Sequence, residues 1–220
     1  MTYDDIIRIT RYLMPLKNGL QEKMVLNLCL PALAYLMGSI SSAILISKLM
    51  GISDPREIGS GNPGATNVLR YGGRKAAFFT LLGDASKAAL PIILAQALGV
   101  AASIATLVGV CALIGHMYPI FYQFKGGKGI ATMIGMSLAL DPLLGASFIA
   151  CWLCIAFLFR YSSLAALGAV LLTPLFAWQL GQDAVSISLL TLAGLLIFGR
   201  HKANIESLLA HTEKKIGGKY

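Results

Sequence analysis

The sequence predicts an all-α integral membrane protein with about seven transmembrane helices. Of its 220 residues, 56% are hydrophobic and only 13% are charged, whereas soluble globular domains carry about 25% charged residues. The mean hydropathy is +0.72, and several apolar runs approach the roughly 20 residues that a helix needs to cross a bilayer. A chain with so little polar surface cannot cover a large soluble core, so we expect it to fold in the membrane.

Seven apolar segments define the expected helices. They lie at residues 25–49, 75–98, 101–121, 129–140, 143–159, 163–180 and 184–199. The fourth segment is short for a full crossing, and only Asp141 and Pro142 separate it from the fifth. These two segments could instead form a broken hairpin buried among other helices, because irregular backbone is tolerated in the membrane only inside protein. Six or eight spans are therefore the alternatives to seven.

Lys and Arg residues divide the connecting loops into two classes. The loops that follow odd-numbered segments contain most of the Lys and Arg beyond residue 23, and they cover residues 51–74, 125–129, 160–162 and 200–220. The loops near 99–101, 141–142 and 181–183 contain no Lys or Arg. Cytoplasmic loops carry the excess of positive charge. We therefore expect the N-terminus outside and the C-terminus in the cytoplasm.

Residues 1–23 differ in character from the rest of the chain. They mix acidic, basic and apolar residues, and the apolar run that begins at Val25 continues into a loop rich in polar residues. This pattern is not that of a cleavable signal peptide. We expect residues 1–23 to be an extension of unassigned role, either an interfacial helix or a result of start-site choice at Met24, and residues 24–220 to be a single membrane domain.

The net charge of +8 has three explanations. Positive loops orient the chain, attract anionic lipid headgroups or bind an anionic substrate, and only local motifs separate these uses. Nucleic-acid binding is not expected, because the basic residues are spread over short loops with little aromatic interleaving.

The sequence indicates no metal or cofactor site. Cys151 and Cys154 form a CxxC inside an apolar run, but no second ligand pair accompanies them, so we expect small buried apolar residues and no disulfide framework. The three histidines and ten carboxylates form no H-E-x-x-H or similar cluster. A G-x-S-x-G nucleophile elbow with triad partners is also absent.

The first polar cluster occupies residues 59–70. Its glycines allow the backbone to approach a ligand closely, and its polar members are Ser60, Asn62, Thr66, Asn67 and Arg70. The planar guanidinium of Arg70 suits phosphate. The alternative is a turn that only caps the next helix, with Asn67 or Thr66 as the cap. The density of polar groups beside a membrane span favours a functional site.

The second cluster covers residues 125–129, Lys-Gly-Gly-Lys-Gly, and follows Gly115 and His116. Its glycines offer bare backbone N–H groups, its lysines offer positive charge, and a helix is expected to begin at Ile130, which are the components of an anion cradle. The Walker A spacing is absent, so nucleotide binding is not indicated. The alternative is a basic loop that only orients the chain. Glycines on both sides of Lys128 favour close contact with phosphate.

The third cluster contains His201 and Asn204, which lie three residues apart and share a face if helical. A histidine can act as a general base or as a charged phosphate donor, although a histidine at a helix exit is often an interfacial cap. Ser163 begins the sixth segment at the same membrane level, as a cap or as part of the site.

Inside the second segment, Asp84 and Lys87 are spaced to form an ion pair. A structural role is expected for this pair, and a substrate contact is the alternative.

All three clusters lie in loops expected on one side of the membrane. A carrier with alternating access needs binding groups near the midplane and usually has paired half-repeats, which this sequence does not show. The pattern therefore predicts a membrane enzyme that acts on a phosphate-bearing substrate at the cytoplasmic face. A transporter of an organophosphate anion is the alternative; an alcohol-phosphatidyltransferase would require paired metal-binding aspartates.

Together these strings resemble the bacterial acyl-phosphate:glycerol-3-phosphate acyltransferase family (PlsY). The resemblance extends from about residue 25 to residue 213, in family order, and is most specific in the runs 59–70 and 124–129. It implies transfer of a fatty acyl group from acyl phosphate to the sn-1 hydroxyl of glycerol 3-phosphate, with lysophosphatidic acid and phosphate as products. This reaction is the first acylation of phospholipid synthesis, it uses no acyl-CoA, and it takes place at the bacterial inner membrane.

The resemblance also implies roles for individual residues. Catalytic roles fall to Ser60, Asn62, Arg70, His201 and Asn204. Substrate- or phosphate-binding roles fall to Asn67, Lys125, Gly126, Gly127, Lys128, Gly129, Ser163 and Glu213. Secondary or structural roles fall to Asp84, Lys87 and His116. No cofactor or metal is expected; the partners are the two substrates and the lipid bilayer, with functional coupling to the enzymes that make acyl phosphate and use lysophosphatidate. The general base is either His201 or an oxygen of a substrate phosphate.

Overall fold

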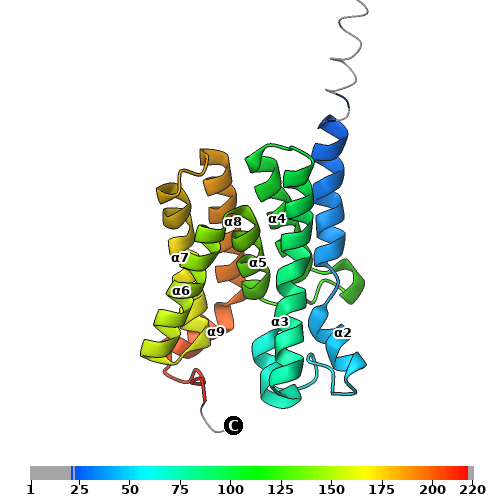
Figure 1. Ribbon diagram of the computed structural model, residues 1–220. Coiled ribbons are helices and arrows are strands. Elements are labelled where there is room, and N and C mark those ends of the chain that lie inside the picture. The colour runs from blue at the N-terminus through cyan, green and yellow to red at the C-terminus, as the bar shows by residue number, and fades with distance from the viewer. Residues whose placement is uncertain (1–20, 22, 218–220) are drawn as a thin grey trace, which may run out of the picture.

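The computed structural model describes residues 21 and 23–217, and every regular element in this part of the chain is helical (Figure 1). The elements are Lys23–Gly38, α2 (Ser42–Leu49), α3 (Ala65–Ala97), α4 (Ala102–Met117), the short 3-10 helix η1 (Ile120–Tyr122), α5 (Ile130–Leu140), α6 (Pro142–Phe159), α7 (Ser162–Gln179), α8 (Ala184–Arg200) and α9 (Lys202–Leu209). The expected N-terminal extension falls almost entirely outside the described residues.

Within the described residues, four helices are long and apolar enough to cross a membrane. They are Ala65–Ala97, Ala102–Tyr122, Pro142–Phe159 and Ser162–Gln179. The number rises to six if two bent pairs each count as one span: Lys23–Gly38 with α2, bent by 42°, and α8 with α9, bent by 63°. The all-helical fold is thus confirmed, and the described residues contain four to six candidate spans in place of the expected seven.

The difference lies in α5, which corresponds to the fourth expected segment. This helix has 11 residues, so it is roughly 17 Å long at about 1.5 Å per residue. That length is about half of the hydrocarbon core of a bilayer. It lies in the middle of the bundle, where it contacts α3, α4 and α6 (Figure 1). Neighbouring helices therefore enclose a segment that cannot cross the membrane by itself.

Small residues allow these helices to pack with their backbones in contact, as is common in membrane proteins. A Cβ atom at Gly135 of α5 would overlap with the carbonyl of Ala85 on α3. In the same way, a Cβ atom at Gly38 in the first helix would overlap with the carbonyl of Ala112 on α4. The contact at Gly135 holds α5 at a defined depth against α3, and with it the loop that precedes α5.

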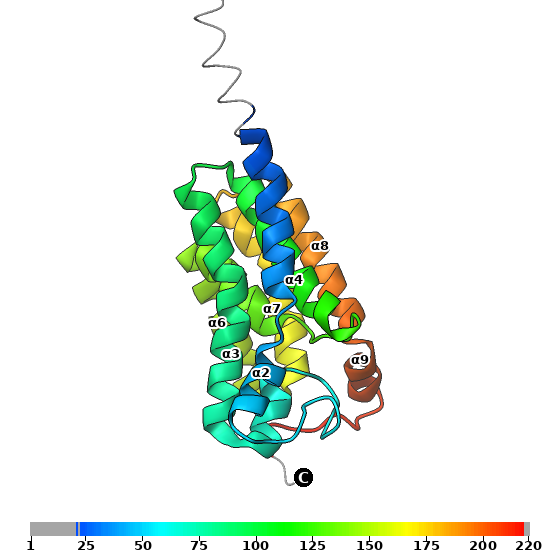
Figure 2. The same cartoon turned by 90° about the vertical axis from the view of Figure 1, so that its right-hand side faces the viewer.

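The polar segments collect toward one end of the bundle. α2, α9 and the C-terminal segment lie at this end, and the beginning of the first helix lies at the opposite end (Figures 1 and 2). Aspartates cap the N-terminal ends of α6 and α8. Oδ1 of Asp141 accepts from the N–H of Leu143 at 2.7 Å, and Oδ1 of Asp183 accepts from the N–H of Val185 at 3.0 Å. The polar segments at the first end form the candidate site.

Candidate active site

The loop before α3 is tied to that helix by Asn67, whose side chain is buried. Its Oδ1 accepts from the backbone N–H of Ser60 at 3.0 Å, and its Nδ2 donates to the carbonyls of Pro55 and Ile58, both at 3.0 Å. Gly59 has a φ of +66°, and a Cβ atom there would overlap with Oδ1 of Asn67. The geometry therefore gives Asn67 a role in holding the loop, and its expected contact with substrate stays a prediction.

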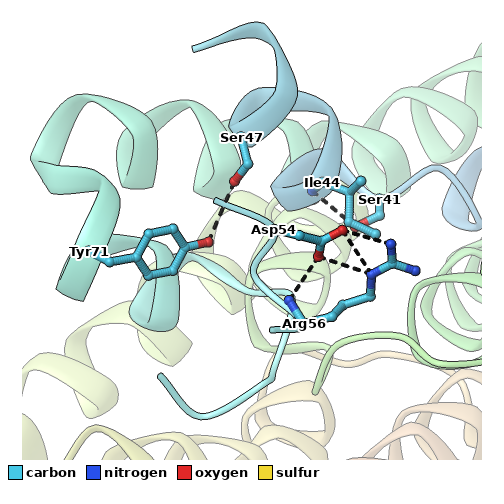
Figure 3. A network of polar contacts seen from close by, with 6 residues as sticks. All are labelled: Ser41, Ile44, Ser47, Asp54, Arg56 and Tyr71. Carbon is cyan, nitrogen blue, oxygen red and sulfur yellow. Dashed lines mark hydrogen bonds and ion pairs between the residues drawn. The ribbon is translucent and has the colours of Figure 1, made fainter. Parts of the chain in front are cut away.

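A second set of hydrogen bonds that stabilises this loop was not predicted from the sequence. Asp54 accepts hydrogen bonds from the backbone N–H of Arg56 at 2.9 Å and from its Nη2 at 2.7 Å (Figure 3). The guanidinium of Arg56 also lies 5.9 Å from the centroid of the Tyr122 ring, so it connects this loop to η1. The only sequence signal was an acid and a base two residues apart in an otherwise polar loop.

The three proposed catalytic residues of the first cluster lie in this loop and in the first turns of α3. Ser60 is exposed, whereas Asn62 and Arg70 are half-buried. Burial lowers the pKa of Lys128, and the positive charge of Arg70 lowers it further. The structure thus brings the first cluster into electrostatic range of the second.

The glycines of residues 125–129 are used differently from the expectation. The N–H groups of Gly126 and Gly127 donate to the carbonyls of Met117 at 3.2 Å and His116 at 3.1 Å. These two N–H groups are consequently bonded to the backbone in this structure, whereas we expected from the sequence that they would be free to cradle phosphate. Their carbonyl oxygens accept from Arg200, whose Nη2 lies 2.6 Å from Gly126 O and whose Nε lies 3.2 Å from Gly127 O.

The other members of this segment stand at the start of α5. Gly129 has a φ of +89° and caps the helix, and its carbonyl accepts from the N–H of Met133 at 2.8 Å. Lys125 is exposed and Lys128 is half-buried. Burial lowers the pKa of Lys128, as do the positive charges of Arg70 and Arg200, while the charge of Glu213 raises it. The ammonium of Lys128 therefore lies in a partly desolvated and positively charged region.

Lys128 begins a chain of hydrogen bonds that joins the second and third clusters. Its Nζ donates to Oδ1 of Asn204, whose Nδ2 donates to Oε1 of Glu213 at 2.9 Å. Oγ of Ser163, at the start of α7, donates to the same Glu213 oxygen at 2.5 Å. Four residues from three separate parts of the sequence thus meet in one network.

His201 occupies the break between α8 and α9, and only 3% of its surface is exposed. Its Nδ1 lies 2.9 Å from the carbonyl oxygen of Ile197. A carbonyl can only accept, so Nδ1 carries the hydrogen and Nε2 of the neutral ring is an acceptor. This tautomer is the one that a general base acting through Nε2 requires.

A separate polar group lies inside the bundle. Lys87 donates to Oδ1 of Asp84 at 2.9 Å and to the carbonyl of Ile40 at 3.1 Å, and Nδ1 of His116 lies 3.5 Å from the same Asp84 oxygen. All three side chains are buried. The expected ion pair between Asp84 and Lys87 is therefore present, and His116 adjoins it.

This arrangement is suited to binding anions. The side chains of Arg70, Lys128 and Arg200 bring positive charge to one region, and His201 lies directly after Arg200. α9 and the C-terminal segment, which carry part of the site, lie at one end of a bundle of apolar helices (Figure 1), so a ligand with a charged head and an apolar tail could occupy both environments. Arg200 was not singled out as a site residue from the sequence, because its contacts with the glycine carbonyls span more than 70 residues.

Comparison with known proteins gives the family. The family model described as glycerol-3-phosphate acyltransferase matches residues 28–211. The chain belongs to this family. It is 47% identical over 187 residues to the glycerol-3-phosphate acyltransferase of Methylococcus capsulatus, covering 84% of this chain and 94% of that protein. The enzyme of the same name from Cupriavidus metallidurans is 48% identical over 200 residues, covering 89% and 98% of the two chains.

Solved structures of this acyltransferase family share the fold. The chain superposes with a TM-score of 0.82 on PlsY (YgiH), an integral membrane glycerol 3-phosphate acyltransferase, in its glycerol 3-phosphate form; the two are 38% identical, with 87% of this chain and 96% of that chain covered. The lysophosphatidic acid form of the same enzyme gives a TM-score of 0.81 at 37% identity, with coverage of 87% and 95%.

Proposed function

We propose that this protein transfers a fatty acyl group from acyl phosphate to the sn-1 hydroxyl of glycerol 3-phosphate and releases lysophosphatidic acid and inorganic phosphate. The observation that carries the proposal is the network from Lys128 through Asn204 and Glu213 to Ser163, beside Arg70, Arg200 and His201, at one end of an apolar bundle. The relatives are named for acylation of glycerol 3-phosphate, and the structural neighbours are described with glycerol 3-phosphate and with lysophosphatidic acid.

The charges of the site match the chemistry of two phosphate-bearing substrates. In the proposed step, the sn-1 oxygen of glycerol 3-phosphate bonds to the acyl carbon, and the bond between that carbon and the phosphate oxygen breaks. The hydroxyl proton passes to Nε2 of His201 or to a substrate phosphate oxygen, and phosphate leaves. Acyl phosphate is already activated, so a serine nucleophile is unnecessary, and positioning with electrostatic stabilisation can supply the rate enhancement.

We assign residue roles from the sequence motifs together with the geometry of the described residues. Direct substrate contacts are proposed for Ser60, Asn62, Arg70, Lys125, Lys128, His201 and Asn204. Glu213 and Ser163 orient Asn204, and Gly129 sets the start of α5 next to Lys128. Asn67 holds the first loop, while Gly126 and Gly127 contribute through their close packing and carbonyl contacts.

The same proposal includes the placement of the enzyme in the cell. The basic loops carry the sequence signal for the cytoplasmic side, so the site opens to the cytoplasm of a bacterial inner membrane and the N-terminus lies outside. Residues 24–220 form one membrane domain in this proposal. The enzyme would receive acyl phosphate from one enzyme and deliver lysophosphatidate to another.

One assay tests the reaction. Purified protein is incubated with acyl phosphate and radiolabelled glycerol 3-phosphate, without CoA or added metal, and labelled lysophosphatidic acid is measured. We expect label in the lipid fraction with acyl phosphate and none when acyl-CoA is the sole donor. Absence of labelled lipid with acyl phosphate overturns the proposal. Uptake of labelled glycerol 3-phosphate into proteoliposomes without an acyl donor would instead indicate the transporter alternative.

A further inference from the structure

We propose that Arg200 and His116 are positioning residues that hold residues 125–129, here called the lysine–glycine segment, from two sides. In this role they set where Lys128 meets a bound phosphate, without touching substrate themselves. The inference rests on the proposed function, because it concerns the site of that reaction. It also assigns a purpose to the buried pair of Asp84 and Lys87, which the proposed chemistry does not use.

The lysine–glycine segment has no regular secondary structure of its own. Residues 125–128 belong to no helix, and the preceding Gln123 and Phe124 have left-handed backbones with φ of 54° and 59°. A segment outside any helix or strand opens more easily than one inside such an element unless neighbours hold it. Because a misplacement of about 1 Å in a reacting group can cost roughly 100-fold in rate, the residues that hold this segment control the position of Lys128.

Arg200 holds the segment from the side of α8. Its Nη2 donates to Gly126 O at 2.6 Å, its Nε donates to Gly127 O at 3.2 Å, and its guanidinium lies 5.4 Å from the centroid of the Tyr118 ring. A planar fork can bond two successive carbonyls while stacked on an aromatic ring, which a lysine ammonium cannot do. Since His201 follows Arg200 in sequence, the same contacts fix the segment relative to the proposed base.

His116 holds the segment from the side of α4. Its carbonyl accepts from the N–H of Gly127 at 3.1 Å, and its ring packs so closely that a Cβ atom at Gly127 would overlap with Nε2. Its Nδ1 lies 3.5 Å from Oδ1 of Asp84, which also accepts from Lys87. Ionisable groups inside a membrane bundle are expensive to bury and are paired. This pairing fixes the ring edge against which the glycine packs.

The two sides meet at Gly127. Its N–H is bonded to the backbone of His116, its Cα packs against the His116 ring, and its carbonyl is bonded to Arg200. Lys128 is the next residue, and its Nζ donates to Asn204. A continuous set of contacts therefore runs from Asp84 in α3 through His116 and Gly127 to Arg200 at the end of α8.

The test compares Arg200→Gln and Arg200→Lys with Lys202→Gln, an exposed cation two residues further along. Steady-state kinetics with acyl phosphate and glycerol 3-phosphate are combined with amide hydrogen exchange of residues 118–129 in the same detergent-purified protein. We expect Arg200→Gln to raise the KM for a phosphate substrate by about 10- to 100-fold, with a smaller fall in kcat. Arg200→Lys should restore only part of this loss, because it retains the charge but bonds one carbonyl.

Hydrogen exchange reports the positioning separately from the chemistry. Exchange of residues 118–129 should accelerate in both Arg200 variants and in His116→Asn, and should match the wild type in Lys202→Gln. Unchanged exchange in Arg200→Gln overturns the proposal, and so does accelerated exchange with an unchanged KM. Full activity of Arg200→Lys would also overturn it, by showing that charge alone suffices. If His116→Asn does not fold, the Arg200→Gln and Arg200→Lys variants alone test the proposal.

Failure of the proposed function is recognised independently. If the wild-type protein forms no lysophosphatidic acid, that function is wrong, whereas the exchange comparison still shows whether Arg200 and His116 hold the segment.

Discussion

Lys128 and Asn204 are joined by a hydrogen bond between Nζ and Oδ1, although 76 residues separate them in the sequence. Lys128 precedes α5 and Asn204 lies on α9, so this bond unites two polar clusters that appear separate in the sequence. Glu213 and Ser163 continue the network from Asn204. Substitutions within this group of four test the site directly.

Lys128→Ala removes the half-buried ammonium at one end of this network. We expect the KM for a phosphate substrate to rise by about 10- to 100-fold, because a charge-assisted hydrogen bond contributes about 1.5–3 kcal/mol. Steady-state kinetics check this, with Lys75→Ala as a control at an exposed lysine of α3. Unchanged kinetics would remove Lys128 from the site.

The pH dependence of kcat/KM should report the lowered pKa of Lys128. Burial disfavours its charged form, so the ammonium loses its proton at a lower pH than an ordinary lysine, whose pKa is about 10.4. Activity that needs the charge is present below this lowered pKa and declines as pH rises through it. Lys128→Arg keeps its charge to higher pH and should move the decline upward. A decline at the same pH in both proteins would assign it to another group.

Glu213 separates the effects of charge and hydrogen bonding. Glu213→Gln keeps an oxygen that can accept from Asn204 and Ser163 but removes the negative charge that raises the pKa of Lys128. We expect moderate activity with the alkaline decline shifted to lower pH. Glu213→Ala loses the acceptor as well and should lose about tenfold or more in kcat/KM. Equal pH profiles for wild type and Glu213→Gln would contradict the electrostatic coupling.

Asn67 should control the stability of the loop before α3. Asn67→Ala removes three hydrogen bonds, and at about 1 kcal/mol each we expect a loss of about 2–3 kcal/mol in unfolding free energy. Asn67→Asp keeps the acceptor for Ser60 but directs a carboxylate at two carbonyl oxygens, so it should be no more stable than alanine. Thermal unfolding in detergent measures both, with exposed Thr66→Ala as the control. A fully stable Asp variant would contradict this hydrogen-bond assignment.

Alanine substitutions at Gly135 and Gly199 together test how closely the helices pack. Alanine at Gly135 would overlap with the backbone of Ala85, which cannot move aside like a side chain, whereas Gly199 has no neighbouring atom near a new Cβ. We expect Gly135→Ala to lose about 1–3 kcal/mol through overpacking. Gly199→Ala should be neutral or more stable by up to about 1 kcal/mol, since glycine is a poor helix former. Equal unfolding temperatures for the two variants would argue against close contact between α3 and α5.

The sequence predicted the helical elements better than their roles in the membrane. Each of the seven apolar segments corresponds to a helix or a bent pair of helices. The sequence left open whether the α5 segment crosses the membrane or is buried among other helices, because hydropathy reports that a segment avoids water but not whether lipid or protein surrounds it. The burial of α5 depends on Gly135 meeting Ala85, a contact between residues 50 positions apart.

The candidate site was likewise predicted only in part from the sequence. Local composition was enough to identify Arg70, Lys128 and His201 as phosphate-binding candidates, since glycines, cations and amides concentrated in loops have few structural uses. Local composition was not enough to predict the hydrogen-bond acceptors of the Gly126 and Gly127 N–H groups, which lie at the end of α4.

By itself, the sequence determined that the protein is helical, enters the membrane and carries polar clusters suited to phosphate. Hydrophobicity and side-chain type belong to each residue and can be read without knowing its neighbours in space. Only the tertiary structure decided which of these groups meet, that Asn67 holds a loop, and that Arg200 bonds the glycine carbonyls. Those relationships depend on distant backbone groups, whose hydrogen bonds must be satisfied wherever the chain brings them together.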